Sequence, residues 1–82
     1  MKMTVEISMY PLREAYIEPI DAFIAALNRA PAVQVATTPT STRIQGEYED
    51  VMQLLKEAMA QSYADHGKAV FVTKFLPGYN PA

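Results

Sequence analysis

The sequence predicts one α+β domain whose strands and helices follow one another as βαββαβ. Three observations predict it. The chain has 82 residues, a length that suits one compact domain. Its hydrophobic residues change twice from a period of two to a period of three or four. Six prolines and three glycines divide it into segments as long as single elements. We therefore treat residues 1–82 as one domain.

The first two segments are typical of a strand and a helix. Residues 3–10 alternate between hydrophobic and polar side chains, as a half-buried strand does. From Ile17 the hydrophobic residues recur at helical spacing. Pro31 disfavours helical geometry at Ala30. We predict a strand at 3–10 and a helix from Ile17 to residues 28–30.

The next segment is typical of a β-hairpin. Residues 33–38 alternate and are rich in β-branched side chains, which favour strands. Pro39, within the polar segment 38–41, favours a turn. A second strand should follow it through Ile44 and end at Gly46.

The last two segments predict a longer helix and a final strand. The acidic residues from Glu47 to Asp50 complement the dipole at a helix start, and Gly67 is a natural C-terminal stop. Residues 69–76 are hydrophobic on both sides and end before Pro77, so they predict a strand that is covered on both faces.

This order of elements predicts a ferredoxin-like fold: a four-stranded antiparallel sheet in the order 4132, with both helices on one face. Alternation along the strands then predicts the side chains on the open face. On the last strand we place the compact Val70 and Val72 toward the helices. The predicted open face then holds Glu6, Ser8, Tyr10, Gln34, Thr38, Ser41, Arg43, Gln45, Phe71, Thr73 and Phe75.

Composition argues against several classes of function. The net charge of −2 argues against nucleic-acid binding, and residues 40–46 lack the aromatic side chains that the third strand of an RNA-recognition domain carries. Without cysteine and with only one histidine, we expect no metal site and no redox cofactor. No apolar run reaches the ~18 residues of a membrane span, so we expect a cytoplasmic protein.

Two titratable residues have both a structural and a functional interpretation. Glu6 lies in the middle of the first strand, where it either pairs across strands with Arg43 or Lys74 or anchors a ligand. An enzyme that uses Glu6 as a base is the weakest hypothesis, because no acid partner is visible. His66 precedes Gly67 and most simply complements the dipole of a helix end, although a histidine can also act as a base or ligand.

Three motifs resemble the YkoF-like thiamine-binding family: E-I-S-M-Y-P-L at 6–12, Ser-Thr at 41–42 followed by Gly46, and H-G-K-A-V at 66–70. The resemblance implies ferredoxin-like domains that associate through their sheets and bind thiamine, or its hydroxymethylpyrimidine portion, without converting it. It also implies a set of ligand-binding residues, to which we add Thr73 for its hydroxyl group on the predicted open face. The set is Glu6, Ser8, Tyr10, Ser41, Thr42 and Thr73.

Two functions therefore stay open. The first is a cytoplasmic carrier or sensor in thiamine salvage or transport, which binds its ligand on the open sheet face of a homodimer or homotetramer, with no membrane or nucleic-acid partner. The second is an association module whose open face only meets another subunit, where aromatic and hydroxyl side chains are equally common.

Overall fold

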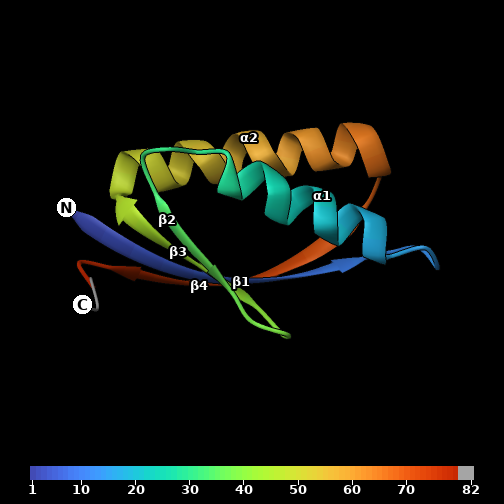
Figure 1. Ribbon diagram of the computed structural model, residues 1–82, viewed down its shortest axis with the longest axis horizontal. Coiled ribbons are helices and arrows are strands. Elements are labelled where there is room, and N and C mark those ends of the chain that lie inside the picture. The colour runs from blue at the N-terminus through green and yellow to red at the C-terminus, as the bar shows by residue number, and fades with distance from the viewer. Residues whose placement is uncertain (80–82) are drawn as a thin grey trace.

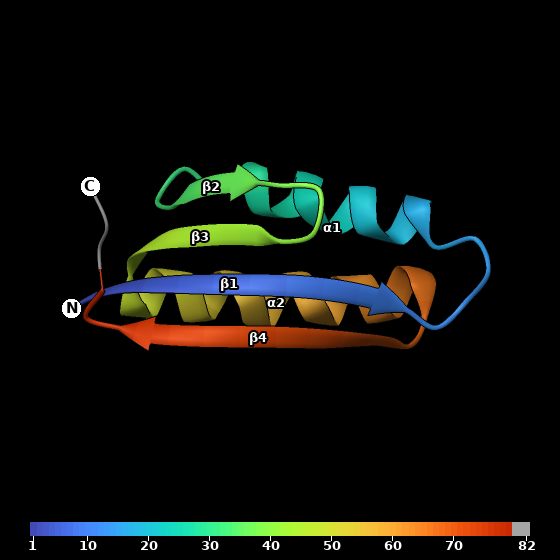
Figure 2. The same cartoon turned by 90° about the horizontal axis from the view of Figure 1, so that it is seen from below.

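The computed structural model describes residues 1–79 and contains the expected series of elements (Figure 1). The antiparallel sheet has the order β2-β3-β1-β4, which is the predicted order read from the other edge. Both helices cover the same face of this sheet, so the ferredoxin-like prediction is confirmed (Figures 1 and 2). The elements are β1 (Lys2–Pro11), α1 (Ile17–Asn28), β2 (Gln34–Thr37), β3 (Thr42–Glu47), α2 (Tyr48–His66) and β4 (Ala69–Pro77).

The core lies between the sheet and the two helices. Every second residue of β1 from Met3 to Ile7 points toward the helices and is buried. Ile44 of β3 and Val51 of α2 are fully buried beside them, as is Leu27 of α1. Alternation along β1 therefore sets the two faces of the sheet, as the sequence predicts.

Gly46 lies inside β3 rather than at its end, because β3 continues to Glu47 and α2 follows without a loop. The register places Gly46 opposite Met3, on the face toward the helices. A Cβ atom on Gly46 would lie 3.1 Å from Cγ1 of Val33 and 3.5 Å from Cγ2 of Val51. The distance to Val33 is shorter than an ordinary contact, so the glycine allows the segment before β2 to pack closely against β3.

The predicted orientation of β4 is wrong. The register pairs Val5 with Phe75 and Ile7 with Thr73, so these β4 residues share the face of the β1 core residues. The ring of Phe71 lies against that of Phe23 in α1, with 5.0 Å between centroids. The large ring of Phe71 packs against α1, and this contact outweighs the compact shape that led us to place Val70 and Val72 on the face toward the helices. Coverage of both faces is also wrong for the isolated chain. The β4 residues on the open face are Val70, Val72, Lys74 and Leu76.

Within residues 1–79, neither helix is both long enough and apolar enough to cross a membrane.

Candidate functional site

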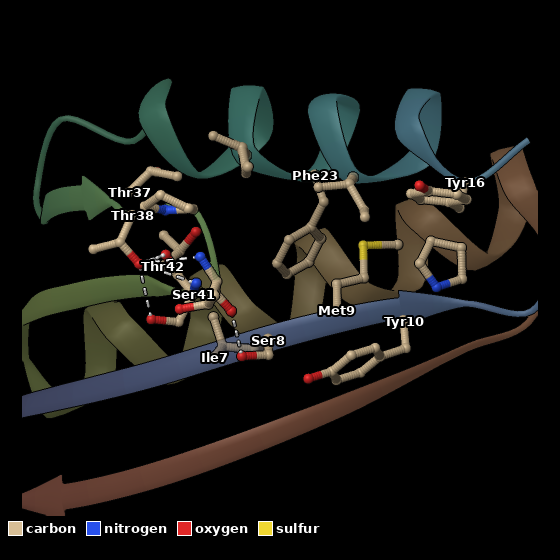
Figure 3. Close-up of a pocket in the computed structure, with 15 residues that line it drawn as sticks. Ile7, Ser8, Met9, Tyr10, Tyr16, Phe23, Thr37, Thr38, Ser41 and Thr42 are labelled. Carbon is tan, nitrogen blue, oxygen red and sulfur yellow. Dashed lines mark hydrogen bonds between the residues drawn. The ribbon is translucent and has the colours of Figure 1, made fainter.

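The two edges of β1 differ in length. β4 pairs with β1 from Met3 to Pro11, whereas β3 pairs with it only from Lys2 to Ile7. Beyond Ile7 the chain of β3 has turned away toward β2, so residues 8–11 have a strand on one side only. A cavity of about 440 Å³ lies beside this segment, between it, α1 and the β2–β3 turn (Figure 3).

The cavity has a polar wall and an apolar wall. Hydroxyl-bearing residues of β1, β2, β3 and the β2–β3 turn form the polar wall. The side chains of α1, with Tyr16 immediately before it, form the apolar wall (Figure 3). The polar wall contains Ser8, Thr37, Thr38, Thr40, Ser41 and Thr42, and the apolar wall contains Tyr16, Ile20, Phe23 and Ile24. Ile7, Met9, Tyr10, Pro11 and Pro39 complete the lining.

Hydrogen bonds hold the polar wall in place. Thr38 and Ser41 close the β2–β3 turn, because the Thr38 N–H donates to the Ser41 carbonyl at 2.8 Å and the Ser41 N–H donates to Thr38 Oγ1 at 3.1 Å. Ser8 Oγ donates to the Thr40 carbonyl at 2.9 Å, which joins β1 to the turn. Two hydroxyl groups of this wall, those of Ser8 and Thr38, are therefore held by backbone groups of a short turn.

The apolar wall joins the cavity to the core. Phe23 is almost completely buried, and its ring packs against Phe71. Tyr16 lies immediately before α1 and is half exposed, so its ring stands where the cavity meets solvent (Figure 3). A flat ring that entered the cavity would thus meet aromatic side chains at its inner and outer ends.

None of the 15 lining residues carries a formal charge. Among residues 1–79, no three histidine, aspartate or glutamate side chains are grouped so that they could hold a metal ion. The hydrogen bond and charge of Lys2, with the N-terminal ammonium, hold the pKa of the Glu47 carboxyl below its usual value. That carboxyl lies where α2 begins, outside the cavity lining. This lining is suited to a neutral polar ring, whether the ring is free or part of a larger molecule.

Four of the predicted ligand residues line this cavity. Ser8, Ser41 and Thr42 contribute to the polar wall, and Thr42 is buried. Tyr10 also belongs to the lining, although its ring points to the opposite side of β1 and is half exposed (Figure 3). The structure therefore brings both sequence motifs, at 6–12 and 41–42, to one place in the fold.

Glu6 and Thr73 do not line the cavity. Glu6 lies on the open face between Arg43 and Lys74, and its carboxylate is 3.4 Å from the Lys74 ammonium. This is the cross-strand pair that the structural interpretation of Glu6 predicts. Thr73 lies opposite Ile7 on the face toward the helices, so its predicted place on the open face is wrong.

Sequence reasoning missed the contribution of α1. The helical spacing from Ile17 predicts this helix, but it assigns Ile20, Phe23 and Ile24 no part in a ligand site. The signal that could have revealed a cavity is a difference in length. The third strand is predicted to begin after the turn at 38–41, so it is too short to follow the whole first strand, while the helix runs on beyond it.

His66 lies in the last turn of α2, as predicted, and Gly67 follows with a positive φ of 83°. The Gly67 N–H donates to the Tyr63 carbonyl at 2.9 Å, which closes the helix. His66 is not among the residues that line the cavity between α1 and β1.

Solved structures with this fold come from several organisms. A Streptococcus pneumoniae protein has a TM-score of 0.88 and 28% identity, over 96% of this chain and 89% of that protein. A Thermotoga maritima protein proposed to act in thiamine biosynthesis or salvage has a TM-score of 0.82 and 25% identity, over 92% of this chain and 82% of that protein. A Bacillus cereus domain of unknown function has a TM-score of 0.79 over 100% of this chain and 79% of that domain. Its sequence identity of 20% supports the fold alone.

No curated protein matches the chain. A family model does match, and it is the model of the thiamine-binding proteins, which aligns with residues 5–74. The match includes β1 from Val5 onward, both helices, the hairpin and most of β4, and so it contains all three sequence motifs, at 6–12, 41–42 and 66–70. The chain therefore belongs to the thiamine-binding protein family.

Proposed function

We propose that the protein binds thiamine, or its hydroxymethylpyrimidine portion, in the cavity between α1 and the end of β1, and does not convert it. The observation that carries the proposal is an uncharged cavity with hydroxyl groups on one wall and aromatic rings on the other, in a chain of the thiamine-binding family. Its volume lies within the range of small-molecule sites. The protein would act as a cytoplasmic carrier or sensor in thiamine salvage or transport.

The chemistry of an aminopyrimidine fits these walls. Its ring nitrogens accept hydrogen bonds and its amino group donates them, all in the plane of the ring. The Ser8 hydroxyl already donates to the Thr40 carbonyl and would accept from the ligand. The hydroxyl groups of Ser41 and Thr42 can donate or accept. The faces of the ring are apolar and would lie against the α1 side chains, including Phe23. A site of this kind binds and orients, and it supplies no acid and base pair for a reaction.

The direct test is calorimetric titration of the purified protein with hydroxymethylpyrimidine, thiamine and the thiazole portion alone. We expect saturable binding of the first two compounds and none of the third. No heat from any of them, in a folded protein, would contradict the proposal.

Two variants then locate the site. Ser8→Ala removes a hydroxyl group of the polar wall and should weaken binding, whereas Glu6→Gln changes the open face and should leave binding unchanged. The reverse result would move the site to the open face of the sheet, away from the cavity.

We also propose that the chain forms a homodimer or homotetramer through its sheet. Val70 and Val72 lie on the open face with 46% and 55% of their surface exposed, and Leu76 lies beyond them on the same face. Exposed aliphatic side chains on one face are typical of a subunit interface.

The same observation supports the second candidate function, an association module without a ligand. Light scattering of wild type and Val72→Lys would test association, and titration decides between the two functions.

A further inference from the structure

The main chain of β1 faces the cavity at Met9. Backbone N–H and C=O groups of one strand residue point to the same side, and the side alternates along the strand. The Leu12 N–H donates to the Lys68 carbonyl, and the Gly78 N–H donates to the Lys2 carbonyl. Even-numbered residues of β1 therefore direct their backbone groups toward β4.

Odd-numbered residues of β1 direct theirs to the opposite side. The Tyr48 N–H donates to the Met1 carbonyl, which agrees with this assignment at the start of the strand. Continuing the register of β1 and β3 past the pair Ile7–Thr42 would place Met9 opposite Thr40. Among residues 1–79, however, Thr40 makes no backbone hydrogen bond with Met9, and its carbonyl accepts the hydroxyl of Ser8 instead.

Met9 thus presents an N–H and a C=O side by side along the edge of β1 that lines the cavity. Pro11, the next odd-numbered residue, has no N–H and cannot do the same. Beyond the last pair with β3, Met9 is therefore the residue of β1 that offers the cavity both a backbone N–H and a backbone C=O. Unpaired backbone groups at a strand edge are a template for whatever can supply the missing partner.

We infer that the backbone of Met9 binds the ligand, and that the ligand is a planar heteroaromatic ring that carries a hydrogen-bond acceptor directly beside a donor. The acceptor receives the Met9 N–H, and the donor gives its hydrogen to the Met9 carbonyl. The ring therefore takes the place of the β3 residue that is missing from the ladder. This inference rests on the proposed function, and the ring nitrogen and adjacent amino group of an aminopyrimidine meet the requirement.

The test is the variant Met9→Pro, which removes the N–H that faces the cavity together with the Met9 side chain, which lines the cavity and packs against the core. Proline is tolerated at strand positions whose N–H does not take part in a ladder, and Pro11 already occupies such a position in β1. Met9→Ala is the matched control, because it keeps the N–H but also loses most of the side chain, and Met9→Leu is a second control that keeps both the N–H and the side-chain volume. We expect Met9→Pro to bind hydroxymethylpyrimidine about 10-fold more weakly than Met9→Ala, and Met9→Leu to stay within about 3-fold of wild type.

The same titrations separate the two ways in which the ideas could fail. A wild type that binds no pyrimidine overturns the proposed function and this inference with it. A wild type that binds, together with a folded Met9→Pro variant that binds as tightly as Met9→Ala, overturns this inference alone. A pyrimidine that lacks the amino group should bind wild type about 10-fold more weakly, and equal affinity for it would also contradict the role of the Met9 carbonyl.

Amide hydrogen exchange provides a second measurement, which needs no variant. Without ligand, the Met9 N–H should exchange much faster than the N–H of Val5 or Ile7, which face β3 within the ladder. Added hydroxymethylpyrimidine should slow the exchange of Met9 at least as much as that of any other residue of β1. Full protection of the Met9 N–H in the free protein would mean that it is already paired, and would overturn the inference even if Met9→Pro fails to fold.

Discussion

The two halves of β1 have opposite surroundings. From Met3 to Ile7 the strand has β3 on one side and β4 on the other, and its inward side chains are buried. From Ser8 to Pro11 it keeps β4 alone, and a cavity takes the place of the neighbouring strand (Figure 3). One strand thus serves the core in its first half and a candidate site in its second.

The difference teaches how a small domain can carry a site. An 82-residue chain has a thin core, and every strand pair counts toward its stability. β3 pairs with β1 only as far as Ile7, four residues short of the end of the β1–β4 ladder at Pro11, so packing is lost at one end of the sheet only. The first half of β1 should therefore be sensitive in stability and the second half in ligand affinity, and four substitutions test this contrast.

The largest effect is expected at Ile44, which is fully buried and lies opposite Val5 in the first half. Ile44→Ala removes buried methyl groups and leaves a void, so the free energy of unfolding should fall by about 2–5 kcal/mol. Urea denaturation followed by circular dichroism measures it. A loss below about 1 kcal/mol would mean that this half of the sheet is not the rigid part of the molecule.

A somewhat smaller effect is expected at Gly46, where the constraint is space. The added Cβ of Gly46→Ala would lie 3.1 Å from Val33 and 3.4 Å from the Ala32 carbonyl, closer than ordinary contacts. The free energy of unfolding should fall by about 1–3 kcal/mol as neighbours shift. The same denaturation series measures it, with Gln53→Ala on the exposed face of α2 as a control. An unchanged midpoint would show that the contact between β3 and residues 32–33 relaxes freely.

The six elements and the orientation of β4 show what the sequence can and cannot predict. Hydrophobic period and the positions of proline and glycine predict all six elements, because each is a local property of the chain. The orientation of β4 is different, because residues 69–76 are hydrophobic on both sides and local pattern does not choose a face. Contact between Phe71 and Phe23, which lie 48 positions apart in the sequence, decides it.

The sequence predicts only part of the candidate site, because some of its features are local to the chain and others depend on how the strands pair. Ser8, Ser41 and Thr42 belong to motifs that can be read along the chain, and they line the cavity. The α1 wall and the free edge at Met9 depend on where β3 stops relative to β1, and that is a property of register. The sequence singles out Glu6 because it is a charged residue within a strand. In the structure its carboxylate forms an ion pair with Lys74 on the open face.

In the second half of β1 we expect the opposite result from that at Ile44. Ser8→Ala removes one half-exposed hydroxyl group and its bond to the Thr40 carbonyl, so the free energy of unfolding should change by about 1 kcal/mol or less. Affinity for hydroxymethylpyrimidine should fall roughly 3- to 10-fold. Calorimetry and denaturation on the same sample give both values. A large loss of stability with unchanged affinity would make Ser8 a structural residue and erase the contrast.

The smallest effect is expected at Glu47, at the end of β3 far from the cavity. Lys2 and the N-terminal ammonium lower the pKa of its carboxyl from 4.5, so the folded state favours the charged form. Its contribution to stability is therefore present above that ordinary value and is lost as the pH falls through the lowered pKa. Glu47→Gln should be slightly less stable than wild type near neutral pH, and the difference should vanish in acid. Because both partners are exposed, added salt should reduce the difference at neutral pH, and a difference that persists in acid would point to packing rather than charge.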